Sequence, residues 1–402
     1  MSPNARAIAF YLPQFHPIPE NNDWWGEGFT EWTNVRQARP LFEGHYQPHV
    51  PSELGYYDLR SSETREAQAE LASAHGIEGF CYWHYWFAGR RLLESPFDSV
   101  LGSGKPDFPF CLAWANHSWT ASWVGRPWEL LVDQTYPGRS DYEAHFSVLR
   151  EAFADDRYIT VDGKPLFLVF RPDKVPDPLE LTDCWRELAH QAGFKGLYLL
   201  GIMNAGSDPR ALGLDGGVHK GLGHLLTFLP SEIQRRAEAR RRAQVLLERP
   251  GLAFIHQAIA RSSRPSWLGP LGAVHDELGN RLLLPSVCSY QELIDSASRW
   301  LEVSDDEFPS VIPNWDNTPR VGRWGWVIQD SSPELFAEHL RHAASLIEDR
   351  PLEKRLVFLK SWNEWAEGNY LEPDERHGRG YLEAMREALS SSMVTPLRKT
   401  GP

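Results

Sequence analysis

The sequence predicts a (β/α)8 TIM barrel of the α/β class, forming one domain over residues 1–390 with a helical insertion at 220–307 and a C-terminal tail at 391–402. Three observations favour this fold. Short β-type runs recur eight times, helix-like stretches separate them, and clusters of polar and aromatic residues follow five of the runs. Alternation of this kind is typical of parallel α/β proteins. An open doubly wound sheet is the alternative, but no glycine-rich phosphate-binding fingerprint follows the first run.

The eight expected strands are short runs of mainly apolar residues. They are "AIAFYL" (7–12), "IEGFCYW" (77–83), "FPFCLAWA" (108–115), "KPLFLVF" (164–170), "GLYLLGI" (196–202), "GLDGGVH" (213–219), "FPSVIPNW" (308–315) and "RLVFLKSW" (355–362). Amphipathic stretches at 61–76, 177–193 and 332–348 have apolar residues at helical spacing, which predicts helices between the strands. Two of them end in glycine, as helix C-termini often do.

Composition argues against several classes of protein. The net charge of −13 disfavours general nucleic-acid binding. The four cysteines, Cys81, Cys111, Cys184 and Cys288, have no CxxC spacing, so we expect no metal site, no disulfide framework and no cofactor. No apolar run reaches 18 residues, which predicts no transmembrane segment. The first residues lack the apolar core of a signal peptide before Pro13, which predicts a cytoplasmic protein unless a leader was removed.

The 17 tryptophans indicate the class of ligand. Many of them stand beside Asn, Asp, Glu or His instead of lying in apolar runs. Indole rings stack on the C–H faces of sugars while neighbouring polar groups bind hydroxyls, so this pairing favours an oligo- or polysaccharide partner.

The polar–aromatic clusters begin at or just after the expected strands. They occupy 13–35, 84–91, 116–123, 316–320 and 363–368. The carboxyl ends of barrel strands share one face, where the active sites of such barrels lie. We therefore expect the five clusters to meet in one site.

The motif "SWNEWAEG" (361–368) supplies two candidate catalytic acids, Glu364 and Glu367, beside Trp362 and Trp365. Glycoside cleavage ordinarily requires two carboxyl groups in different protonation states, and apolar walls can keep one of them protonated. Residues three apart on a strand point to opposite faces, so convergence requires the strand to end near Glu364 and turn, which Gly368 favours. The structural alternative is that one glutamate only hydrogen-bonds the loop.

Four motifs together resemble a known family. "YLPQFHPIPENNDWWGEGFTEWTNV", "HGIEGFCYWHYWF", "PSVIPNWDNTPR" and "SWNEWAEGNYLEPD" are similar to WbsX-type proteins, which are related to glycoside hydrolase family 99, and the resemblance runs from about Ala7 to about Ala384. It implies a (β/α)8 barrel. The family's hydrolases cleave α-mannosidic bonds within chains, with retention and without a metal. WbsX members often occur among surface-polysaccharide genes and are often labelled glycosyltransferases.

The resemblance also implies roles for the acid pair. Glu364 matches the base that removes a proton from the sugar's own 2-hydroxyl, forming a 1,2-anhydro sugar. Glu367 matches the acid/base that protonates the departing oxygen and then activates water. This route needs an axial 2-hydroxyl, so the leading function is a retaining glycoside hydrolase of an α-linked manno- or rhamno-configured polysaccharide.

Two other functions stay open. One is a glycosyltransferase of surface (O-antigen-type) polysaccharide biosynthesis, although no DxD motif or glycine-rich strand–helix turn is present to hold a diphosphate. The other is a catalytically dead sugar-binding protein, which the intact acid pair disfavours.

Further residues of the clusters are expected to bind substrate. They are Tyr11, His16, Trp83, His84, Tyr85, Asn116, His117, Trp119, His219, Lys220, Asp316, Trp362, Asn363 and Trp365. Strand alternation lets only some of Trp83, His84 and Tyr85 face the pocket. Asp316 could instead close an Asx turn, and Glu31 could serve catalysis or structure.

Several of these positions depart from the family pattern. "WANHSW" replaces an expected "WANENW", and His219 and Lys220 stand where an acid is common, which hints at an acidic substrate. The insertion contains a basic stretch at 235–249, which is either a solvated helix face or a site for an anionic polymer or lipid carrier.

Overall fold

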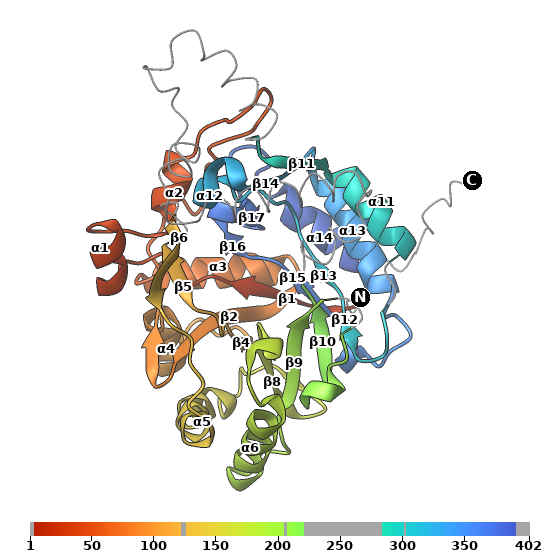
Figure 1. Ribbon diagram of the computed structural model, residues 1–402. Coiled ribbons are helices and arrows are strands. Elements are labelled where there is room, and N and C mark those ends of the chain that lie inside the picture. The colour runs from red at the N-terminus through yellow and green to blue at the C-terminus, as the bar shows by residue number, and fades with distance from the viewer. Residues whose placement is uncertain (1–3, 122–125, 205–206, 221–283, 301–302, 391–402) are drawn as a thin grey trace.

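The computed structural model describes residues 4–121, 126–204, 207–220, 284–300 and 303–390 (Figure 1). The basic stretch at 235–249 lies outside the described residues.

The centre of the structure is a barrel of parallel strands. Their order is β12-β10-β9-β8-β4-β2-β1-β15-β13. The bounds are β1 Arg6–Tyr11, β2 Ile77–Phe87, β4 Phe110–Trp114, β8 Lys164–Val169, β9 Tyr198–Met203, β10 Gly216–His219, β12 Glu307–Phe308, β13 Ser310–Val311 and β15 Leu356–Leu359. Each of the eight predicted runs contributes to one strand position, which confirms the predicted fold class.

The barrel closes through one short segment. Phe308 of β12 pairs with Val218 of β10, while Val311 of β13 pairs with Leu359 of β15. β12 and β13 are therefore two halves of the seventh strand, separated by Pro309, and this strand joins the two ends of the row. The Pro309 carbonyl accepts a hydrogen bond from the backbone of Phe358, so the link between the two halves is itself bonded to β15.

Helices surround the strands, with α4, α5 and α6 on one side of the barrel and α11, α13 and α14 on the other (Figure 1). The bounds are α1 Pro19–Trp25, α2 Glu31–Gln37, α3 Ser62–Ala74, α4 Ser95–Ser103, α5 Arg139–Phe153, α6 Pro178–Gln191, α11 Tyr290–Trp300, α12 Thr318–Val321, α13 Pro333–Ser345 and α14 Gly380–Ser390. The three predicted helices are α3, α6 and α13. The expected alternation fails once: among the described residues between β9 and β10, the helical element is only the 3-10 turn η3, Arg210–Leu212.

Three small sheets lie outside the barrel. They are β5 (Trp119–Ala121) with β6 (Arg126–Val132), β11 (Ser286–Ser289) with β14 (Trp326–Gln329), and β16 (Asn363–Glu364) with β17 (Asn369–Tyr370). The β11 and α11 segment is the described end of the predicted insertion. The hydroxyl of Tyr290 donates to the Ile312 carbonyl at 2.5 Å, so this end of the insertion packs against the chain that follows the seventh strand. The predicted domain limits stay a prediction.

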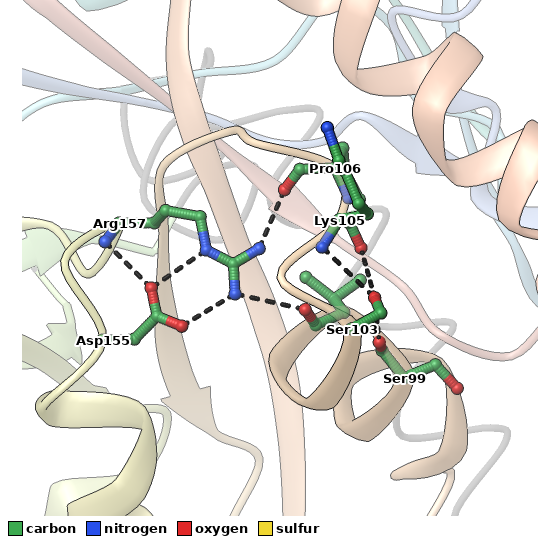
Figure 2. A network of polar contacts seen from close by, with 7 residues as sticks. Ser99, Ser103, Lys105, Pro106, Asp155 and Arg157 are labelled. Atoms are coloured by element: carbon green, nitrogen blue, oxygen red, sulfur yellow. Dashed lines mark hydrogen bonds and ion pairs between the residues drawn. The ribbon is translucent and has the colours of Figure 1, made fainter.

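Arg157 joins neighbouring segments near the amino end of β4 (Figure 2). Its guanidinium forms two parallel hydrogen bonds with Asp155, of 2.9 and 2.7 Å, and also donates to the carbonyls of Pro106 and Val100. These contacts join the turn before β4 to the turn after α5. Side chains at this face of a TIM barrel serve stability, which leaves the opposite face for the functional site.

Within the described part of the chain, no helix is long and apolar enough to cross a membrane. The four cysteines are buried and unbridged, at positions in or near strands and helices where a small apolar side chain packs well.

Candidate active site

The acid motif forms a tight turn above the eighth barrel strand. β15 ends at Leu359, β16 carries Glu364, and the 3-10 turn η8 (Trp365–Glu367) leads to β17, which pairs antiparallel with β16. Gly368 closes the turn with φ +59°, and a Cβ there would lie 2.8 Å from the Asp316 backbone nitrogen. The strand therefore ends and turns at the place where convergence of the two acids requires it, and both acids line one cavity.

This cavity has a volume of about 310 Å³ and opens at the carboxyl ends of the strands. Volumes of this size are at the lower end of the range for small-molecule sites. Its aromatic walls are Trp24, Trp25, Trp83, Tyr85, Trp119 and Phe170, and its polar lining includes Gln14, Asn21, His117, Ser118, Arg320, Lys360, Glu364 and Glu367. Each of the five clusters that the sequence predicts to meet in one site contributes at least one of these residues, with Arg320 representing 316–320.

Glu364 is a buried carboxyl with little hydrogen bonding. Oε1 accepts one hydrogen bond of 3.2 Å from Trp83 Nε1, and Oε2 is buried without a hydrogen-bond partner among the described residues. Burial, and then the negative charge of Glu367, raise the pKa of Glu364 to about 7. An acid with this pKa exchanges its proton readily near neutral pH.

Glu367 differs from Glu364 because it is ion-paired. Arg320 Nη1 donates to its Oε1 at 2.6 Å, while Nη2 of the same guanidinium donates to Glu31 Oε1, also at 2.6 Å. Burial acts to lower the pKa of Arg320, but the charges of Glu31, Glu367 and Glu364 outweigh it and raise that pKa. Burial also raises the pKa of Glu31, against the effect of Arg320. The two acids of the motif thus have unequal surroundings.

Strand alternation decides which residues of β2 face the cavity. Trp83 and Tyr85 line it, and the Trp83 ring stacks on Phe10 with centroids 4.9 Å apart. His84 points to the opposite side, where its Nε2 lies 2.9 Å from Nε2 of His145 on α5. Burial lowers the pKa of His84 to about 3, so it is a neutral core residue and not a sugar ligand.

His117 and Trp119 also line the cavity. The Trp119 ring contacts Tyr85 edge-on at 5.2 Å, and the Nδ1 atom of His117 is buried without a hydrogen-bond partner among the described residues. Burial, followed by the charge of Arg171, lowers the pKa of His117 to about 4. Lys220 is not in the lining itself, but its Nζ lies 5.9 Å from the ring centroid of Phe170, which is.

The sequence model of the family described as Glycosyltransferase WbsX matches residues 7–385. The chain belongs to the WbsX glycosyltransferase family. Two curated relatives, both described as uncharacterized protein WxcX from strains of Xanthomonas campestris pv. campestris, are 35% and 34% identical over 388 residues. These matches cover 96% of this chain but 50% of each WxcX protein, so the chain spans half of their length.

Solved structures similar to this WbsX-family chain share its fold. A glycoside hydrolase-like protein aligns with a TM-score of 0.55 and 12% identity, over 98% of this chain and 95% of that one. The GH99 endo-alpha-mannosidase from Bacteroides thetaiotaomicron aligns with a TM-score of 0.51 and 13% identity, over 96% of this chain and 97% of that one. At these identities the likeness shows the fold alone, a TIM barrel.

Four of the expected substrate ligands lie beneath the site in a hydrogen-bonded network. Glu372 accepts hydrogen bonds from Trp365 Nε1, Gln68 Nε2 and the Tyr57 hydroxyl, at 2.6 to 2.8 Å. The Tyr11 hydroxyl donates to Gln68. The side-chain amide of Asn363 accepts a hydrogen bond from the Leu12 backbone N–H and donates one to the Leu12 carbonyl. Trp362 is fully buried. Tyr11, Trp362, Asn363 and Trp365 do not line the cavity. They support the acid motif from below: the polar groups of Tyr11, Asn363 and Trp365 are hydrogen-bonded within the protein, and Trp362 packs in the core.

Four more expected ligands also lie away from the cavity: His16, His219, Asn116 and Asp316. His16 is buried with Nδ1 2.9 Å from the Pro13 carbonyl, and His219 lies 3.8 Å from Glu307. Asn116 uses its amide to hold the Tyr136 hydroxyl and the backbone of Arg171.

Asp316 accepts hydrogen bonds from the backbone and hydroxyl of Thr318, at 3.0 and 2.6 Å, as the Asx-turn alternative predicted. It also contacts His45 Nε2 and Gln47 Nε2, at 2.7 and 2.6 Å. With both carboxylate oxygens engaged, Asp316 shapes the turn behind Gly368 and is not available to a sugar.

Two charged residues of the cavity were not singled out from the sequence, Arg320 and Lys360. Arg320 closes the "DNTPR" cluster and Lys360 directly follows the eighth strand, so their position at strand ends is the signal that could have found them. Among the described residues, no group of three or more His, Cys, Asp or Glu side chains is placed to hold a metal ion.

Proposed function

We propose that this chain is a retaining glycoside hydrolase that cleaves an α-linked manno- or rhamno-configured polysaccharide. The observation that carries the proposal is the unequal acid pair: Glu364 is buried with its pKa raised to about 7, and Glu367 is ion-paired with Arg320, in one tryptophan-lined cavity. Glycoside cleavage ordinarily requires two carboxyl groups whose surroundings hold them in different protonation states.

In the proposed reaction, Glu364 removes the proton from the sugar 2-hydroxyl, and that oxygen attacks C1. The glycosidic C1–O bond breaks as Glu367 gives its proton to the departing oxygen. Water deprotonated by Glu367 then opens the 1,2-anhydro sugar at C1, and Glu364 returns a proton to the 2-oxygen. Two inversions at C1 leave the configuration retained.

The protons of the pair must be redistributed when substrate binds. In the free protein the raised pKa of Glu364 places a proton there below about pH 7, whereas the proposed first step needs that proton on Glu367. Interacting acids titrate as a pair, and the proton's position depends on what contacts each carboxyl. A 2-hydroxyl donating to Glu364 would favour its ionised form, so substrate itself supports the redistribution.

The sugar class is proposed from two sources. The route through the 2-oxygen works when that oxygen is axial, as in mannose or rhamnose. A structural neighbour of this chain is named an endo-alpha-mannosidase, which favours an α-linked polymer with cleavage inside the chain.

Glycosyl transfer is the second candidate function, and the family description favours it. A sugar hydroxyl could open the 1,2-anhydro sugar in place of water, and the same two acids would then build a bond instead of breaking one.

Incubation with intact polysaccharides distinguishes the two functions. Products from a panel of α-mannans and rhamnose-containing polysaccharides are analysed beside parallel reactions with GDP-mannose and dTDP-rhamnose plus sugar acceptors. Hydrolase action predicts shorter chains that form without a nucleotide and are absent with Glu364→Gln. Chain extension that requires a sugar nucleotide, with no cleavage of any polysaccharide, would contradict the hydrolase proposal and support the transferase.

A further inference from the structure

Three half-buried cations stand at the carboxyl ends of three barrel strands. Arg171 is two residues after β8, Lys220 directly follows β10 and Lys360 directly follows β15. We call these three residues the cation cluster. Lys360 lines the cavity, and Lys220 lies over Phe170, which lines it too. Lys360 therefore reaches the space in which Glu364 and Glu367 stand, while Lys220 and Arg171 lie beside its wall residues Phe170 and His117.

Within the described part of the chain, no ion pair neutralises the cation cluster. The Nε atom of Arg171 is buried without a hydrogen-bond partner among the described residues. Asp173 acts on Lys220 electrostatically, but its carboxylate lies 3.6 Å from Lys174. Arg320, across the same cavity, is instead held by Glu31 and Glu367, both at 2.6 Å.

The members of the cluster also act on one another. Burial lowers the pKa of Lys220, and the charge of Arg171 and then that of Lys360 lower it further. The same two charges, after burial, lower the pKa of His117 in the cavity wall. Placing like charges together in a partly desolvated site costs stability, and nothing in the fold requires it, since neutral side chains could occupy these strand ends.

We propose that the cation cluster binds an anionic group of the sugar ligand, and the inference rests on the proposed function only in taking the ligand to be a sugar. The group is a carboxylate, sulfate or phosphate, each of which accepts several charge-assisted hydrogen bonds from Arg and Lys. It has two sources: an acidic substituent on the glycan itself, or the phosphate of an activated sugar donor. Neutral glycans would leave the cluster uncompensated.

Calorimetric titration tests this subsite without turnover. The full chain carrying Glu364→Gln is titrated with three probes: an α-linked mannose disaccharide, the same disaccharide with one C6 oxidised to a carboxylate, and GDP-mannose. We expect a charged probe to bind at least about tenfold more tightly than the neutral disaccharide, with an advantage that falls as sodium chloride rises. Tighter binding of the oxidised disaccharide assigns the anion to the glycan, and tighter binding of GDP-mannose assigns it to the donor.

Variants locate the effect. Adding Arg171→Gln or Lys220→Gln should each remove most of the charged probe's advantage while changing neutral disaccharide binding by no more than about twofold. Lys174→Gln is the matched control, because Lys174 lies in the same loop as Arg171, is exposed and pairs with Asp173. The Gln variants of the cation cluster should have melting temperatures no lower than that of the parent, because each substitution removes like-charge repulsion. A loss of affinity would therefore not reflect unfolding.

Equal affinity for all three probes would overturn the inference, as would an advantage that survives both Arg171→Gln and Lys220→Gln or disappears equally with Lys174→Gln. These outcomes are separate from failure of the proposed function, because the hydrolase reaction is tested by turnover and the subsite by binding.

Discussion

Arg320 Nη1 donates a hydrogen bond of 2.6 Å to Oε1 of Glu367, the second acid of the motif. Glu31 holds the same guanidinium from the other side at 2.6 Å. Because Glu31 is fully buried and does not line the cavity, it acts on the site through Arg320 and through its charge. Glu31 is therefore a positioning residue, and its removal should change the electrostatics of the pair without touching substrate.

The variant Glu31→Gln should shift the pH dependence of turnover. The charges of Glu31 and Glu364 raise one another's pKa, so neutralising Glu31 should lower that of Glu364 and move the basic limb of kcat/KM, expected near pH 7, to lower pH. We expect kcat to fall by about tenfold and KM to change little, because the residue positions an acid instead of binding sugar. Glu27→Gln, at an exposed site, is the control and should shift nothing. An unchanged pH profile in Glu31→Gln would assign that residue a purely structural role.

The unmodified chain should lose activity as pH rises through about 7. The proposed first step uses the single proton shared by the acid pair, and in the free protein Glu364 holds that proton with a pKa raised to about 7, so kcat/KM should drop about tenfold per unit above that pH. Initial rates from pH 5 to 9 measure this limb. A loss of activity as pH falls below 7 would show that the reaction needs both acids ionised, which contradicts proton donation by Glu367.

Glu364→Gln should stabilise the protein at high pH. Burial raises the pKa of this carboxyl from 4.5 to about 7, so wild-type stability is lost as pH rises between these values, by on the order of 3 kcal/mol. Thermal melts should place the variant above the wild type at pH 8, with the difference shrinking towards pH 5. A pH-independent difference would show that Glu364 ionises as freely in the folded state as in the unfolded one. The exposed Glu151→Gln provides the control.

Retention at the anomeric carbon should be visible in the first product. Proton NMR recorded before mutarotation is expected to show the α-anomer from an α-linked substrate. The β-anomer as first product would exclude a 1,2-anhydro intermediate, whatever the two variants of the acid pair do.

Much of the barrel could be predicted because its strands are continuous apolar runs. In a parallel barrel both faces of a strand are buried, so "KPLFLVF" reads as a strand without knowledge of its partners. The short β9–β10 connection could not be predicted, because no periodic stretch was needed to join two strands that already lie side by side.

Strand alternation predicted which side chains of β2 share a face. The sequence could not show which polar side chains already have hydrogen-bond partners within the protein. Alternation along β2 correctly allowed Trp83 and Tyr85 to share a face that excludes His84. Nothing local reveals that the amide of Asn116 is used by the Arg171 backbone, a residue 55 positions away. The Arg320–Glu31 pair is separated by 289 positions, so its formation likewise depends on barrel closure.

The central claim is that Glu364 and Glu367 carry the chemistry, and turnover of the two glutamine variants tests it most directly. Initial rates of Glu364→Gln and Glu367→Gln are measured on the polysaccharide that the wild type cleaves, after circular dichroism shows that both are folded. We predict that each variant loses at least about 10²-fold in kcat, the size of a general acid or base contribution. Near wild-type turnover in either folded variant would remove that glutamate from the mechanism and contradict the account.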